Sequence, residues 1–86
     1  MSPQERFAAN LRRARLGAGL SQEELGYRCD LHRTEVSLLE RAGREPRMAT
    51  IVKLAAILET STDQLCAGVS WLPARRCFVV ERPPDA

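Results

Sequence analysis

The side chains that could support catalysis or metal binding are few and poorly placed for either. Cysteine occurs three times, at Cys29, Cys66 and Cys77, and the single histidine is His32. An odd number of cysteines without a C-x-x-C spacing favours neither a disulfide framework nor a zinc site, so we expect reduced, partly buried thiols. The sequence also lacks the glycine-rich and serine motifs of nucleotide-binding and hydrolytic enzymes. We therefore expect no metal, no cofactor and no enzymatic activity, and interpret the chain as a binding protein.

Arginine carries the most evident binding chemistry in this sequence. Twelve of the thirteen cationic residues are arginine, and Lys53 is the exception. The planar guanidinium forms paired hydrogen bonds with phosphates and with guanine edges. The formal net charge of +2 is only mildly basic, however, and a GC-rich genome also favours arginine codons. Composition alone thus leaves two explanations open, a nucleic-acid partner or genome composition.

Length and hydropathy limit the architecture that can position these side chains. The chain has 86 residues, 44% of them hydrophobic and 28% charged, which allows one domain with one modest core. No apolar run approaches the roughly 20 residues that span a bilayer. Glu5 and Arg6 lie where a signal peptide would be apolar. We expect a cytoplasmic protein with no membrane segment.

Capping boxes mark the starts of three helices, in the runs SPQE at 2–5, SQEE at 21–24 and STDQ at 61–64. Leu20 and Leu25 add a hydrophobic staple around the second start. Apolar residues at helical spacing, ended by glycine, proline or turn residues, predict five helices. We expect them over about residues 3–17, 22–29, 32–41, 48–58 and 61–68.

The end of the chain is typical of strands. The runs VSWL at 69–72 and CFVV at 77–80 are rich in β-branched and aromatic residues, and PARR at 73–76 has a length suited to a hairpin loop. The pattern predicts a short β-hairpin over 69–80, followed by a frayed end at 81–86.

The run LSQEELGYRCDLHRTEVSLLERAGREP, followed by MATIVKLAAILETSTDQL, resembles the Cro/phage-repressor, or Xre-like, family of helix-turn-helix transcriptional regulators. The resemblance covers residues 5–66, and several family markers occur in order within it. It implies an all-α, five-helix, phage-repressor-like DNA-binding domain over 1–68, which leaves 69–86 as a C-terminal hairpin extension and tail. It also implies sequence-specific binding of double-stranded DNA by a transcriptional regulator, either a repressor or an activator.

The resemblance assigns roles on the DNA side of this domain. Helix 32–41 would read the major groove, with the base-contacting residues Arg33, Thr34, Ser37 and Leu38. The DNA-backbone contacts would come from Gln22, His32, Arg44 and Arg47. For Arg33 a guanine contact and a phosphate clamp remain equal alternatives. His32 is expected to cap the helix or face phosphate rather than to bind a metal. Glu35 would be repelled by phosphate, so we expect it to pair with His32 or to accept from a cytosine amino group.

Periodicity also places two charges toward the core. Glu40 follows the buried position Val36 by four residues, and Arg15 follows Leu11 by four, so both lie along buried stripes. Because an unpaired buried charge is costly, we expect Arg15 and Glu40 to form a structural ion pair. Related family members carry such a pair at the matching positions, as the resemblance implies.

Three loop positions depart from the family pattern, in which glycine is usual. Asp30, Ala42 and Glu59 stand there instead, and Asp tolerates the left-handed conformation better than most residues. Gly26 retains the small residue expected where the second and third helices cross.

Two questions about partners stay open at this point. Family members bind two half-sites as dimers, so we expect a homodimer formed by the hairpin residues Trp71, Phe78, Val79 and Val80, although these side chains could equally cover the helical core. The alternative function is a protein-interaction module, such as an antitoxin or coactivator. Polar residues on helix 32–41 favour DNA, whereas Leu38 and the low net charge count against it.

Overall fold

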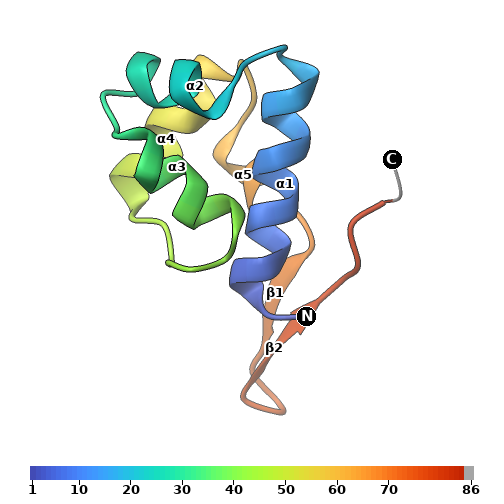
Figure 1. Cartoon of the computed structure of the whole chain (residues 1–86). Coiled ribbons are helices and arrows are strands. Elements are labelled where there is room, and N and C mark those ends of the chain that lie inside the picture. Colours follow the sequence, from blue (N-terminus) through green and yellow to red (C-terminus); the bar gives the residue numbers. More distant parts are fainter. Residues whose placement is uncertain (85–86) are drawn as a thin grey trace.

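The computed structural model describes residues 1–84 and contains five helices and two strands among them (Figure 1). In chain order they are α1 (Pro3–Gly17), α2 (Gln22–Arg28), α3 (Arg33–Glu40), α4 (Met48–Ile57), α5 (Thr62–Leu65), β1 (Val69–Leu72) and β2 (Cys77–Val80). This order confirms the expected five-helix domain with a C-terminal hairpin. Over the described residues, no helix has both the length and the apolar character needed to cross a membrane.

Serine caps begin α1 and α2 as the sequence predicted. The Ser2 hydroxyl accepts from the Glu5 N–H at 3.1 Å, and the Glu5 carboxylate accepts from the Ser2 N–H at 2.8 Å. Ser21 and Glu24 repeat this reciprocal pair. The serine hydrogen bonds hold the pKa of Glu5 and of Glu24 below the usual range, since they favour the ionised carboxylate. At α5 only half of the expected box forms, because the Ser61 hydroxyl accepts from the Gln64 N–H without a return bond.

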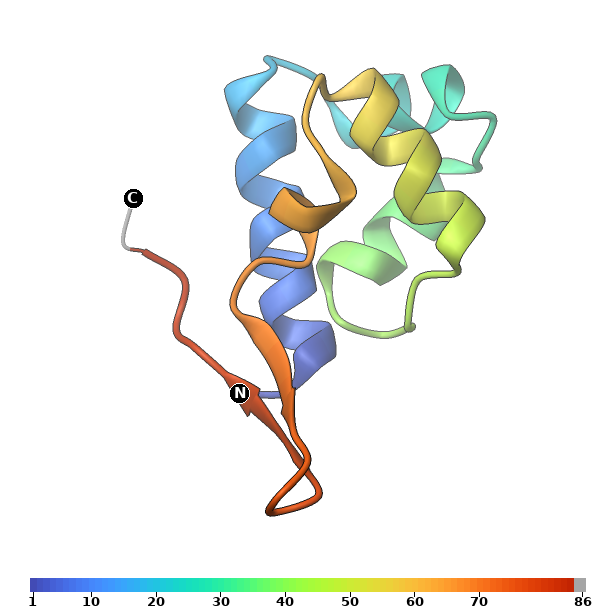
Figure 2. The same cartoon turned by 180° about the vertical axis from the view of Figure 1, so that it is seen from behind.

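One hydrophobic core lies between the helices. Its fully buried side chains come from every helix: Leu11, Leu25, Val36, Leu39, Leu54 and Leu65. Figures 1 and 2 show α4 and α5 on the opposite side of this core from α3. Cys29 is also buried, and burial raises the pKa of its thiol, whereas Cys66 and Cys77 are exposed. The three thiols are free, as expected, but two of them are less buried than the sequence suggested.

Tight turns hold the helices at close range. Positive φ angles occur at the three loop positions where the family usually has glycine. They are 57° at Asp30, 57° at Ala42 and 53° at Glu59. At Gly26 an added Cβ would lie 2.8 Å from the Leu31 carbonyl oxygen, so the backbone leaves no room for a side chain. This confirms that Gly26 marks a close approach between α2 and the turn that precedes α3.

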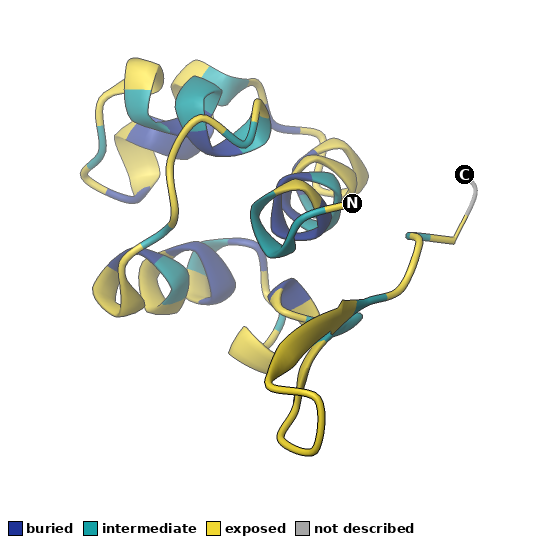
Figure 3. Cartoon of the chain, turned by 90° about the horizontal axis from the view of Figure 1, so that it is seen from below, coloured by how far each residue is buried: buried dark blue, intermediate teal, exposed yellow. Residues whose placement is uncertain are grey.

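The hairpin lies beside the N-terminal end of α1, while α2 lies at the other end of that helix (Figure 1). β1 and β2 pair antiparallel, with Val69 opposite Val80 and Trp71 opposite Phe78. Figure 3 shows the hairpin to one side of the helices, with most of its residues exposed. Val69 and Val80 are half-buried, and Val69 and Phe78 line a hollow together with Phe7 of α1. The hairpin therefore covers one edge of the helical core, while Trp71 and Phe78 remain more than half exposed.

The frayed end expected at 81–86 begins later than predicted. Glu81 donates its N–H to the Gly68 carbonyl at 2.8 Å and accepts at its own carbonyl from Arg6 at 2.5 Å. Residues 82–84 form no helix or strand, and residues 85 and 86 lie outside the described residues.

Candidate nucleic-acid interface

α2 and α3 are joined by a four-residue connection and present one open face. A shallow depression runs between the start of α2 and the first turns of α3, and its outer residues include Gln22, Arg33, Thr34 and Ser37. The expected base-contacting residues Arg33, Thr34 and Ser37 thus lie together with the expected backbone contact Gln22. The depression thus adjoins the N-terminal turns of both helices, where the helix dipole favours negatively charged groups.

His32 caps α3 through its imidazole ring. Nδ1 accepts from the Thr34 N–H at 3.1 Å and lies 2.9 Å from the Thr34 hydroxyl. Because Nδ1 accepts, the remaining ring proton is on Nε2, which faces away from the cap. The histidine therefore replaces the usual serine or threonine cap and still has one donor for an external group.

Arg33 is the most available cation on this face. Its side chain is 70% exposed and meets Glu23 of α2 only at 3.8 Å, where the Glu23 side chain is itself 77% exposed. Such an exposed and long pair contributes little free energy, so a ligand can displace it.

Glu35 does not close the capping box expected with His32. Its carboxylate pairs with the guanidinium of Arg44 in the loop between α3 and α4. Arg44 was expected to contact DNA phosphates, and its pairing with Glu35 was not predicted. The pair holds the loop against α3 and neutralises the Glu35 carboxylate.

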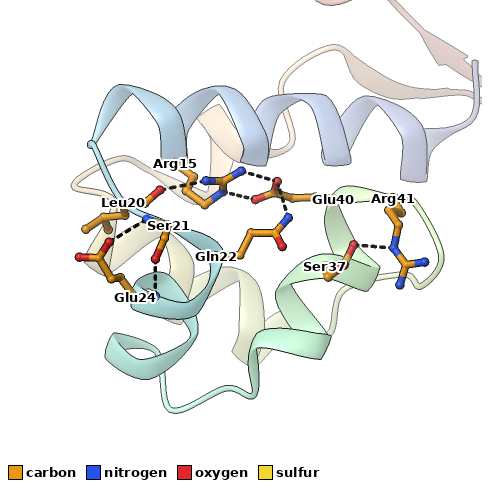
Figure 4. A network of polar contacts seen from close by, with 8 residues as sticks. All are labelled: Arg15, Leu20, Ser21, Gln22, Glu24, Ser37, Glu40 and Arg41. Atoms are coloured by element: carbon orange, nitrogen blue, oxygen red, sulfur yellow. Dashed lines mark hydrogen bonds and ion pairs between the residues drawn. The ribbon is translucent and has the colours of Figure 1, made fainter.

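Leu38 does not lie free on the open face. It is half-buried, and its Cδ2 atom lies 3.2 Å from the place a Cβ would take at Gly43. Beside it, the Ser37 carbonyl accepts from Arg41 Nε at 3.3 Å (Figure 4). Arg41 was not among the expected site residues, although its spacing of four from Ser37 on one helix could have indicated it. Arg47 precedes α4 and is exposed, with no side-chain capping bond.

Arg15 and Glu40 form a buried ion pair that also includes Gln22 (Figure 4). Arg15 donates to the two Glu40 carboxylate oxygens at 2.5 and 2.9 Å, and to the Leu20 carbonyl at 2.9 Å. Glu40, whose side chain is 3% exposed, accepts a third bond from Gln22 Nε2 at 3.2 Å. The bonds to Glu40 raise the pKa of the Arg15 guanidinium. This network links α1, α2 and α3, and it orients Gln22 at the edge of the open face.

Comparison with known proteins identifies relatives of this chain. A family model described as helix-turn-helix matches residues 11–65. The Neisseria hypothetical transcription factor of Neisseria meningitidis is 43% identical over 59 residues, which cover 69% of this chain and 56% of that protein. Control protein C.BamHI of Bacillus amyloliquefaciens is 40% identical over 60 residues, which cover 69% of this chain and 74% of that protein.

The fold of this chain also matches that of a solved controller protein. The crystal structure of the restriction-modification controller protein C.AhdI from Aeromonas hydrophila matches with a TM-score of 0.70 and 35% identity, over 72% of this chain and 94% of that chain. The family match ends at residue 65, before β1 begins. The open face of α2 and α3 therefore lies within the matched region, and the hairpin lies beyond it.

Proposed function

Because this chain belongs to the Xre-like helix-turn-helix family of DNA-binding transcription regulators, we propose that α3 enters the major groove and reads the sequence of duplex DNA there. Arg33, Thr34 and Ser37 supply the base contacts, with Arg33 on a guanine edge. Leu38, being half-buried, contributes at most an apolar contact at the edge of the helix. Residues 1–68 form the DNA-binding unit, which acts in the cytoplasm.

The DNA backbone contacts flank the recognition helix in this proposal. Gln22 and His32 meet phosphates at the starts of α2 and α3, where free N–H groups already favour an anion. Arg47 binds a phosphate of the DNA strand that lies beyond the end of α3. Arg44 binds the same DNA strand after its ion pair with Glu35 is replaced by one with a phosphate. The observation that carries the proposal is the exposed, weakly paired Arg33 on the open face beside Gln22.

A protein-interaction module is less well supported by the same face. The exposed residues of α3 are polar or cationic and Leu38 packs over the Gly43 turn, so this face offers little apolar area to a protein partner.

Selection from a pool of random duplexes tests the function. We expect enrichment of one sequence with two inverted half-sites, bound at least about 10³-fold more tightly than random duplex. If the selected sequence also occurs in the genome of origin next to restriction–modification genes, this chain would group with the control proteins it resembles. A pool that shows no enrichment would contradict DNA reading by α3.

We further propose that the hairpin of residues 69–80 makes a homodimer. A single helix-turn-helix reads few base pairs, and a dimer places two of them one helical turn apart on the DNA. Trp71 and Phe78 pack edge to face with ring centroids 5.0 Å apart, yet they remain 52% and 57% exposed. Such exposed aromatic pairs are typical of protein interfaces.

Alternation along the strands separates the four residues expected in the dimer. Trp71, Phe78 and Val80 share one face of the hairpin, and Val79 lies on the other face with Leu72. The aromatic face is therefore the centre of the proposed interface, and Val79 contributes at its edge.

The double variant Trp71→Ser with Phe78→Ser tests the dimer. We expect the variant to sediment as a monomer, to bind an isolated half-site as the wild type does, and to lose cooperative binding to the inverted repeat. Val52→Ser is the matched control, because Val52 is exposed to a similar degree on α4. A double variant that stays dimeric, or a wild-type chain that is monomeric at high concentration, would contradict the hairpin interface.

A further inference from the structure

Arg6 is a buried cation that DNA reading does not use. Only 5% of the residue is exposed. Its guanidinium is satisfied by neutral oxygens, since Nε donates to the Asn10 side chain at 3.0 Å and Nη1 donates to the Glu81 carbonyl at 2.5 Å. Burying a cation is costly, so an arginine held by carbonyl groups indicates a position that needs its reach and its several donors.

Asn10 and Gly68 complete the contacts around Arg6. The Asn10 amide donates to the carbonyls of Leu65 and Ala67 at 2.9 and 2.8 Å. Gly68 has φ +87°, and a Cβ there would lie 2.4 Å from the Arg6 Cζ atom. The chain thus needs glycine at this point both for its backbone conformation and for the approach of Arg6.

These residues hold both ends of the hairpin to one helix. Gly68 directly precedes β1 and Glu81 directly follows β2, while Arg6 and Asn10 lie one turn apart on α1. We call Arg6, Asn10, Gly68 and Glu81 the hairpin clasp. Beyond the clasp the strands extend past the helices, and most of their side chains are exposed (Figures 1 and 3).

Helix α1 also holds the DNA-reading helices, at its other end. Arg15 lies nine residues after Arg6 on α1, which corresponds to about 14 Å along the helix axis, and it fixes Glu40 of α3 and, through Glu40, Gln22 of α2. One stiff helix therefore connects the hairpin to α3 through a buried arginine at each end.

We propose that the hairpin clasp fixes the direction of the hairpin relative to α3 and so sets the spacing of the DNA half-sites that the protein accepts. This inference rests on the proposed hairpin dimer. In such a dimer the two copies of α3 can reach successive major grooves only at the separation that the hairpin angle allows. Arg6 and Asn10 act as positioning residues, because they contact neither DNA nor the partner chain.

Two measurements on Arg6→Met and Gly68→Ala test the clasp, with Arg12→Met as the control because Arg12 is an exposed arginine on the same helix. The first measures the distance between spin labels at Ala56→Cys on α4 and Ala74→Cys in the hairpin loop, after the native cysteines are replaced. Labelled chain is diluted with unlabelled chain so that distances within one molecule dominate. The second measures affinity for inverted repeats whose half-sites are moved apart by single base pairs, together with affinity for an isolated half-site.

We expect the wild type and Arg12→Met to show one narrow distance and a preference of about tenfold or more for one spacing. Both clasp variants should keep the half-site affinity, broaden the distance distribution and lower the spacing preference to about threefold or less. If circular dichroism shows lost helix in Arg6→Met, Asn10→Ala provides the same test, because it removes the Asn10 bonds to Arg6, Leu65 and Ala67.

Two results would contradict the clasp inference without affecting the proposed dimer. In the first, the clasp variants keep the narrow distance distribution of the wild type. In the second, their distance distribution broadens but their preference for one half-site spacing is unchanged. A wild-type chain that reads its half-site but shows no spacing preference would contradict the proposed dimer, and the inference with it. The distance measurement separates these cases, since it reports on the clasp in a single chain.

Discussion

Individual residues on the open face differ in how firmly the protein holds them before DNA arrives. Arg33 is exposed and weakly paired, whereas Gln22 is already oriented by Glu40 and His32 is already engaged as a cap. An exposed, weakly paired cation is free to contact base edges, whereas an amide held in one orientation suits the uniform phosphate backbone. This difference leads to separate predictions for Arg33 and Gln22.

Arg33→Ala should weaken binding to the selected site by about 1–3 kcal/mol and relax the preference at one base pair. Gln22→Ala should instead weaken binding to every duplex by a similar factor, because its contact carries no sequence information. Affinities for the selected site and for its single-base variants measure both effects. Equal losses on all sequences for Arg33→Ala would identify Arg33 as a phosphate clamp.

Glu40→Ala should destabilise the fold by about 3–5 kcal/mol, because it leaves the buried Arg15 without its counterion. It also removes the acceptor that orients Gln22. Denaturant unfolding measures the loss. The control is Glu23→Ala, which removes an exposed partner of Arg33 and should change stability by less than about 1 kcal/mol. An unchanged unfolding midpoint for Glu40→Ala would contradict the structural role of the pair.

At the scale of secondary-structure elements, the angle between α2 and α3 depends on how closely their backbones approach. Gly26 permits this approach because the Leu31 carbonyl lies where a Cβ would be. The helix propensity of alanine exceeds that of glycine by about 1 kcal/mol, so an open position would gain from the exchange. At Gly26 the steric conflict opposes that gain, and it involves backbone atoms that cannot rotate away.

Gly26→Ala should therefore destabilise the protein by about 1–3 kcal/mol, as overpacking does in other cores. Gly17→Ala in the last turn of α1 is the matched control, since its Cβ would meet no atom within 4 Å, and it should be neutral or stabilising. Thermal or denaturant unfolding of the two variants measures the difference. A Gly26→Ala chain as stable as Gly17→Ala would show that α2 and α3 can separate freely.

At the scale of the whole molecule, net charge is a poor guide to the strength of DNA binding. The formal charge is only +2, but Arg33, Arg44 and Arg47 lie on α3 or in the loop that follows it, and this distribution matters more than the sum. Two or three phosphate-neutralising arginines in each chain of a dimer give about four to six released counterions.

The logarithm of the binding constant should consequently fall with the logarithm of salt concentration at a slope of about −4 to −5. Arg47→Gln should reduce the magnitude of that slope by about 2, because each dimer loses two phosphate contacts. Titrations of the selected duplex over a series of salt concentrations measure both slopes. A flat dependence would contradict an interface formed by arginine and phosphate.

Features that depend on neighbouring residues could be predicted from the sequence. The capping boxes at Ser2 and Ser21 and the hairpin register follow from hydrogen bonds and alternation over a few residues. The pairing of Arg15 with Glu40 could also be inferred, because helical periodicity turns both charges toward the core.

Contacts between distant segments were decided only by the tertiary structure. The burial of Arg6 could not be predicted from local sequence, because the carbonyl to which it donates belongs to Glu81, 75 residues away. The pairing of Glu35 with Arg44 and the bond from Gln22 to Glu40 likewise depend on how helices and loops pack together. Local sequence determines which groups a helix presents, but the partner that each group finds depends on the arrangement of the whole chain.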